Sequence, residues 1–193
     1  MKKKHVFPWW AGYLLINPLR KLNLDPEKIL GNYVKEGMTV IDAGCAMGFF
    51  SLPLARMVGD EGRVVCVDIQ EKMLSRLKKR ADSAGLDKRI ITRECSPEWL
   101  RIDDFHGRAD AAIAFGVVHE TPDEGAFIAQ LGRSVRPGGL LVIGEPKGPV
   151  NEAAFNETVR KAESSGFSIE SFKETGSCRI TFFRKHGTQD GTD

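Results

Sequence analysis

The chain has 193 residues, of which 41% are hydrophobic and 28% charged, so it has the size and composition of one soluble domain with a substantial core. These proportions argue against disorder, and the formal net charge of +2 gives no reason to expect nucleic acid as a partner. The four cysteines lie far apart and form no C-x-x-C pair. We therefore expect no metal site, no disulfide framework and a cytoplasmic location.

The N-terminal region combines a basic start, Lys2-Lys3-Lys4, with an apolar stretch from Trp9 to Ile16. This stretch is much shorter than the ~20 apolar residues that span a bilayer. No small-residue cleavage site follows it. We expect neither a signal peptide nor a membrane span, and an interfacial anchor is a minor alternative.

From Met38 onward, short runs rich in β-branched residues alternate with amphipathic runs at helical spacing. The predicted strands cover residues 38–42, 63–68, 89–94, 109–115 and 140–144, with a turn at Pro137-Gly138-Gly139 before the fifth. The predicted helices cover residues 49–58, 71–84, 122–135 and 152–165. Two further strands, 167–172 and 178–184, are close enough to form a hairpin, which places an antiparallel strand on the sheet.

Repeated strand–helix order implies right-handed crossovers and a sheet covered by helices on both faces. We predict a single α/β domain over residues 1–193, with its core at 37–185 and a loose tail at 186–193. Its fold is a Rossmann-like, doubly wound sheet of seven strands, mostly parallel, with one antiparallel strand near the C-terminus. Such sheets bind ligands at the carboxyl ends of their strands. The residues at or just beyond these ends are Asp42, Asp68, Cys95, Gly116 and Glu145.

The segment Asp42-Ala43-Gly44-Cys45-Ala46-Met47-Gly48 joins the first strand to a helix. Small residues at 44, 46 and 48 let the backbone turn sharply and approach a ligand. A dinucleotide-binding loop would need the register G-x-G-x-x-G from Gly44, but Ala46 and Phe49 replace its second and third glycines. Phenylalanine obstructs the helix–strand packing that the third glycine permits. This register disfavours a nicotinamide-dependent oxidoreductase, which is kept as the alternative interpretation.

This loop resembles the first motif of class I S-adenosylmethionine-dependent methyltransferases, an acidic residue followed by glycines at alternate positions. Asp42, Gly44 and Gly48 match the motif, whereas Ala46 stands where glycine is usual. One added methyl should adjust the loop slightly without loss of binding. The resemblance implies that these residues, together with Cys45, lie against the methionine and ribose of S-adenosylmethionine.

The resemblance also implies a role for Asp68, because the acidic residue at the end of the second strand accepts both ribose hydroxyls in this family. Two neighbouring hydroxyl donors suit a bidentate carboxylate. It further implies contacts with the adenine and around the methyl-transfer site. The remaining residues of the predicted cofactor site are Ile69, Gln70, Ser96, Phe115 and Gly116.

Methyl transfer by in-line displacement needs a base only if the acceptor carries a proton on its attacking atom. His119 is the best candidate, because histidine titrates near neutrality and this one follows the fourth strand; a backbone-bonded histidine is the alternative. Glu145 is a candidate substrate or acid–base residue, with capping or ion pairing as the alternative. Glu120 is interpreted as part of the next helix start. Cys45 and Cys95 admit a thiol-assisted metalloid methyltransferase as a minor alternative.

In this fold an N-terminal segment often covers the cofactor, so we interpret residues 1–36 as a helical cap or lid. Its Trp9, Trp10 and Tyr13 either wall a flat or cationic acceptor or pack the first helix onto the core. The near-neutral charge favours a small-molecule acceptor, as in the methyltransferases that include quinone-biosynthesis enzymes. A monomer, a homodimer and a non-catalytic cofactor-binding module of the same fold remain open.

Overall fold

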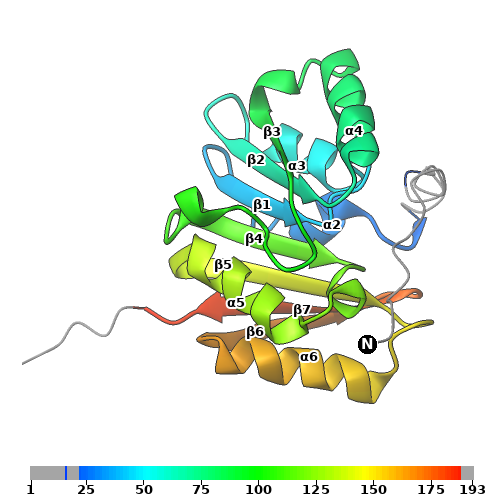
Figure 1. The fold of residues 1–193 in the computed structure, drawn as a ribbon, viewed down its shortest axis with the longest axis vertical. Coiled ribbons are helices and arrows are strands. Elements are labelled where there is room, and N and C mark those ends of the chain that lie inside the picture. The colour runs from blue at the N-terminus through cyan, green and yellow to red at the C-terminus, as the bar shows by residue number, and fades with distance from the viewer. Residues whose placement is uncertain (1–15, 17–21, 188–193) are drawn as a thin grey trace, which may run out of the picture.

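The computed structural model describes residue 16 and residues 22–187, which form helices packed around one seven-stranded sheet (Figure 1). The strands are β1 Thr39–Ala43, β2 Arg63–Asp68, β3 Ile90–Glu94, β4 Ala109–Phe115, β5 Val135–Pro146, β6 Phe167–Glu174 and β7 Cys178–Lys185. The helices are α2 Pro26–Leu30, α3 Ser51–Met57, α4 Glu71–Ser83, α5 Glu124–Ser134 and α6 Glu152–Ser164, and the short 3-10 turns are η3 Asp87–Arg89, η4 Asp103–Phe105 and η5 Val118–Glu120.

The sheet has the strand order β3-β2-β1-β4-β5-β7-β6. Neighbouring strands from β3 to β5 are parallel, while β7 runs antiparallel to both β5 and β6. One antiparallel strand therefore lies near the C-terminus, and the predicted fold class is confirmed. The chain proceeds outward from β1 to β3 and then returns to β4 on the other side of β1. This reversal is the topological switch point where doubly wound sheets bind ligands.

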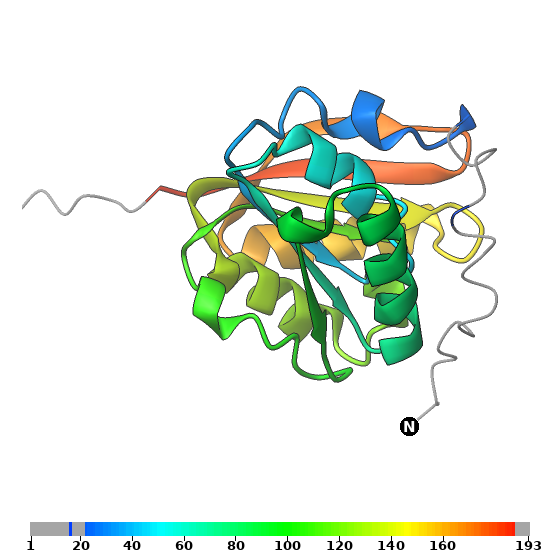
Figure 2. The same cartoon turned by 90° about the horizontal axis from the view of Figure 1, so that it is seen from above.

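The two faces of the sheet bury two separate apolar clusters. On one face, residues of α2, α3 and α4 pack against Val40, Val64 and Ile113. On the other face, α5 and α6 cover Ile41 and Val65. Figure 2 shows α2 and α6 on opposite sides of the sheet. Because neighbouring strand residues point to opposite faces, both sides of β1 and β2 must be apolar, and this explains their continuous hydrophobic runs.

Strand β5 begins at Val135 and not at Leu140 as predicted. Ala109 pairs with Val135 and Ala111 pairs with Leu140, so the register between β4 and β5 shifts at this point. The expected turn at residues 137–139 is therefore an irregularity within a strand that pairs on both sides of it. Gly138 provides the left-handed backbone there, with φ of +70°.

The described part of the predicted N-terminal cap packs into the core. Asp25 accepts hydrogen bonds from the amides of Glu27 and Lys28 and so begins α2. Leu24 and Leu30 are buried in the cluster shared with α3 and α4. Trp9, Trp10 and Tyr13 lie outside the described residues. Between residues 22 and 187, no helix combines the length and apolarity that crossing a bilayer requires.

The starts of three strands are joined by Asp110. Its carboxylate accepts a 2.8 Å hydrogen bond from the Thr39 amide and a second 2.8 Å bond from Arg136 Nε. Replacement Asp110→Ala leaves the Thr39 amide without this acceptor. We expect the free energy of unfolding to fall by about 1–3 kcal/mol, measured by urea denaturation. Asp82→Ala, an exposed change on α4, is the control, and equal effects of the two substitutions would contradict the assigned role of Asp110.

Candidate active site

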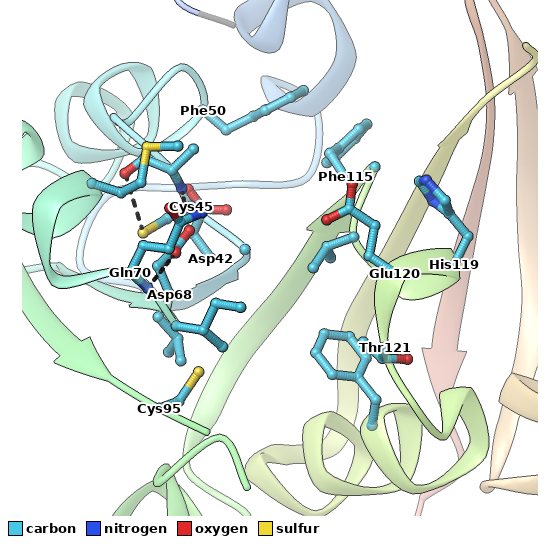
Figure 3. Close-up of a pocket in the computed structure, with 18 of the residues that line it drawn as sticks. Asp42, Cys45, Phe50, Asp68, Gln70, Cys95, Phe115, His119, Glu120 and Thr121 are labelled. Atoms are coloured by element: carbon cyan, nitrogen blue, oxygen red, sulfur yellow. Dashed lines mark hydrogen bonds between the residues drawn. The ribbon is translucent and has the colours of Figure 1, made fainter. Parts of the chain in front are cut away.

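A cavity of about 880 Å³ opens at the carboxyl ends of the parallel strands, a volume typical of small-molecule sites (Figure 3). It is lined by the loops that follow β1, β2, β3 and β4, on both sides of the switch point. Every residue of the predicted cofactor site except Gly48 lines this cavity: Asp42, Gly44, Cys45, Ala46, Asp68, Ile69, Gln70, Ser96, Phe115 and Gly116. Gly48 lies behind the loop, next to Leu77 of α4.

The loop after β1 requires a glycine at position 44. Gly44 has a φ of +73°, and a Cβ atom there would lie 2.6 Å from a methyl carbon of Val117. Ala46 is also left-handed, with a φ of +47°, a conformation that costs an alanine roughly 1–2 kcal/mol. Glycine adopts this conformation readily, which explains the usual glycine at this position of the motif. The Ala46 amide is held by a 2.9 Å hydrogen bond to Asp68 Oδ2.

The carboxylate of Asp68 is 8% exposed and faces the cavity at the end of β2. Oδ2 accepts from the Ala46 amide and Oδ1 accepts from the Gln70 amide, both at 2.9 Å. Because each carboxylate oxygen has two acceptor positions, each can still accept from a ligand hydroxyl. Burial raises the pKa of Asp68, and the backbone amides partly offset this rise.

Asp42 lies deeper in the same wall. Ser51 Oγ donates a 2.5 Å hydrogen bond to its Oδ2. Burial raises the pKa of Asp42 to about 7, the Ser51 bond opposes the rise, and the nearby charge of Asp68 adds to it. The charge of this carboxyl therefore changes near neutral pH, and a cation in the cavity would favour its ionised form.

His119 and Glu145 form a pair at the other side of the cavity. His119 lines the cavity and its Nδ1 contacts Glu145 Oε2, while the Val118 amide donates a 3.0 Å bond to Glu145 Oε1. Glu145 is 1% exposed and does not line the cavity. It therefore contacts the imidazole from outside the cavity, on the Nδ1 side of the ring.

Several further residues line the cavity that the sequence did not assign to the site, among them Phe50, Glu120 and Thr121. The Phe50 ring stacks on Phe115 with 4.0 Å between ring centroids. Glu120 belongs to η5 and not to α5, and this single turn directs its side chain into the cavity (Figure 3). Burial raises the pKa of Glu120, and the neighbouring His119 opposes the rise. The feature of the sequence that could have indicated Glu120 as a site residue is its position, as an acidic residue just after the fourth strand.

Three cysteines line the cavity, Cys45, Cys95 and Cys178, and the pKa values of the first two are raised. Burial and the adjacent Cys66 raise the pKa of Cys45 well above its usual range. Burial and the charge of Asp68 raise the pKa of Cys95 to about 12. Since the thiolate is the form that binds metalloids and metals, this environment argues against thiol-assisted metalloid chemistry. Within the described part of the chain, no cluster of three or more His, Cys, Asp or Glu side chains has the arrangement of a metal site.

A family model described as a methyltransferase domain matches residues 34–179. The chain belongs to this methyltransferase family. It is 27% identical over 177 residues to the ubiquinone biosynthesis O-methyltransferase of Rhizobium etli, covering 84% of the chain and 64% of that protein. It is 32% identical over 120 residues to the ubiquinone/menaquinone biosynthesis C-methyltransferase of Cellvibrio japonicus, covering 62% of the chain and 47% of that protein. The methyltransferase thus spans less than two thirds of the length of these curated relatives.

Among solved structures, the methyltransferase resembles an S-adenosylmethionine-dependent methyltransferase from Aquifex aeolicus, with a TM-score of 0.83 and 27% identity. The match covers 93% of this chain and 100% of that one. Together with the family model, this similarity identifies the protein as a class I S-adenosylmethionine-dependent methyltransferase. The nicotinamide-dependent alternative is therefore wrong.

The raised pKa of Asp42 makes the folded protein less stable at higher pH. The folded form keeps a proton on Asp42 up to about pH 7, whereas the unfolded chain releases it near 3.8, so stability falls as pH rises through this interval. Asp42→Asn cannot ionise and should be more stable than the wild type at pH 8 by roughly 1–3 kcal/mol, with a small difference at pH 4. Thermal and urea unfolding at both pH values measure this, with Asp82→Asn as the control; a pH-independent difference would contradict it.

Proposed function

We propose that the protein transfers a methyl group from S-adenosylmethionine to a small-molecule acceptor by in-line displacement and releases S-adenosylhomocysteine. The observation that carries the cofactor assignment is the buried Asp68 carboxylate, because both of its oxygens retain acceptor capacity beside the loop at Ala46. The cavity of about 880 Å³ is large enough for a cofactor and an acceptor together.

The lining residues divide into three groups around the proposed cofactor. Asp68 accepts the two ribose hydroxyls, and the backbone at Gly44 approaches the ligand because no side chain intervenes. The adenine is flanked by Ile69, Gln70 and Ser96; the Ser96 hydroxyl already accepts a 3.1 Å bond from the Trp99 amide and can donate one more. The methionine end is lined by Asp42, Cys45, Phe115 and Gly116.

When bound, the cofactor supplies a methyl group on a positively charged sulfur. His119 accepts the proton of an acceptor hydroxyl or amine at Nε2. Glu145 accepts a hydrogen bond from Nδ1–H, which keeps Nε2 unprotonated before the reaction, and it stabilises the imidazolium that forms. The apolar walls at Phe50 and Phe115 exclude water from the reacting atoms. Glu145 is a positioning residue in this scheme and does not touch the acceptor.

The proposal also covers the type of acceptor, the location, the N-terminal aromatic residues and the oligomeric state. The two relatives described above are named for O- and C-methylation in quinone biosynthesis, which supports an aromatic acceptor and does not specify the atom that is methylated. The described cysteines are free thiols, three of them buried, which supports a reducing cytoplasm. We also propose that Trp9, Trp10 and Tyr13, which lie outside the described residues, bind the acceptor, and that the protein acts as a monomer or homodimer.

Binding of S-adenosylhomocysteine tests the cofactor assignment directly. We expect micromolar affinity by isothermal calorimetry, no binding of NAD, and a loss of at least tenfold in affinity for Asp68→Asn, since charge-assisted hydrogen bonds contribute roughly 1.5–3 kcal/mol. Asp87→Asn, an exposed change outside the cavity, is the control. If the wild-type protein binds neither S-adenosylmethionine nor its product, the proposed function is refuted.

The roles of His119 and Glu145 are separated by kinetics on a panel of phenolic and amine acceptors. We expect His119→Gln to lower kcat by about 10²-fold or more while S-adenosylhomocysteine affinity is unchanged, because a base contributes roughly 10²–10⁴-fold. Glu145→Gln should lower kcat less and shift the pH–rate profile, since it acts through the imidazole. Wild-type kcat in His119→Gln would show that no base is used there.

A further inference from the structure

The charged side chains that line the cavity are predominantly acidic. Asp42, Asp68 and Glu120 all contribute carboxyl groups to its wall, and Glu98 lies at the same surface. Among residue 16 and residues 22–187, no lysine or arginine lines the cavity. Apolar surface makes up most of the remaining wall, and the carboxylates of Asp42 and Asp68 are buried in it. Positive charge is favoured inside the cavity, and negative charge is disfavoured.

Glu120 is the carboxyl that is best placed to act on the acceptor. It follows His119 directly in η5, and in Figure 3 its side chain extends toward Phe115 within the cavity. Burial raises the pKa of Glu120, the charge of His119 lowers it, and the charges of Glu145 and Asp68 raise it, so all three groups lie near enough to interact with Glu120. No described residue donates a hydrogen bond to its carboxylate, which leaves the group available to a ligand.

The surface beside Glu120 is aromatic and flat. Phe50 and Phe115 stack with an angle of 18° between their planes, and Phe49 packs edge-on against Phe50. A Cβ atom on Gly144 would lie 2.3 Å from the Phe115 ring, so the ring rests directly on the backbone of β5. Phe127 of α5 lines the same cavity. Aromatic faces of this kind favour planar rings and cations and offer nothing to an anion.

We propose that the part of the methyl acceptor held in the cavity is a planar, apolar group without negative charge, and that Glu120 selects neutral and cationic acceptors against those carrying a carboxylate or phosphate. This inference rests on the proposed methyltransferase function. An anionic acceptor would lose its hydration in an apolar cavity and be repelled by Glu120, with no described lysine or arginine in the wall to compensate. A protonated amine would gain a carboxylate partner in the same place.

The test uses three phenols that differ in the charge of one substituent: tyramine, para-ethylphenol and para-hydroxyphenylacetate. Each is titrated by calorimetry into protein saturated with S-adenosylhomocysteine, so the readout is binding and not turnover. We expect the cationic and neutral phenols to bind at least tenfold more tightly than the anionic one. Glu120→Gln should reduce the ratio of cation to anion affinity at least fivefold. Glu163→Gln, an exposed loss of the same charge on α6, should leave the ratio unchanged.

The possible failures are distinguishable. If the anionic phenol binds as tightly as the neutral one, the charge selectivity is overturned, and an unchanged ratio in a Glu120→Gln protein with wild-type S-adenosylhomocysteine affinity overturns the role of Glu120. If none of the three phenols binds to protein that does bind S-adenosylhomocysteine, the planar aromatic acceptor is wrong. Absence of S-adenosylhomocysteine binding instead refutes the proposed function on which this inference rests.

Discussion

The hydrogen bond from the Ala46 amide to the Asp68 carboxylate is the constraint on which the active site depends. It joins the loop after β1 to the end of β2 and holds Ala46 in a left-handed conformation that alanine would otherwise avoid. The amide of Gln70 orients the second oxygen of the same carboxylate. These two bonds allow a charged group to be buried at the edge of a cavity, because they replace part of the hydration that it loses. The open lone pairs of Asp68 then point toward ligand space.

The order of the elements was predictable because it follows from short-range patterns. Apolar runs separated by amphipathic segments are visible in the sequence, and the handedness of the crossovers restricts how such units assemble. The start of β5 was not predictable in this way. Residues 137–139 have the composition of a turn, and only pairing of Val135 with Ala109 of β4 extends the strand across them. Pairing between distant segments is not encoded in a local window, and the same limit applies to the exact bounds of α3 and α5.

The same distinction between local sequence patterns and tertiary packing applies to the candidate site. Asp42 and Asp68 were found because strand ends can be located in the sequence and the carboxyl edge of a parallel sheet brings them together. The direction of a side chain depends on packing that no motif describes. Glu145 is directed behind His119 by its bond to the Val118 amide, and Glu120 is turned inward by η5. Sequence reasoning therefore identified the edge of the sheet at which the cavity opens, and could not separate the residues that face the cavity from those behind them.

Burying several carboxyl groups in one apolar cavity lowers stability, as the raised pKa values of Asp42, Asp68 and Glu120 indicate. Active sites commonly retain such groups at the expense of stability because function requires them. Here the proposed cofactor offers a reason. Ionised carboxylates are stabilised by the positive sulfur of S-adenosylmethionine and not by the neutral sulfur of its product. With S-adenosylmethionine as the cofactor, as proposed, the carboxylates of the wall would favour the reactive form over its product, so the charges that destabilise the empty fold would also promote turnover.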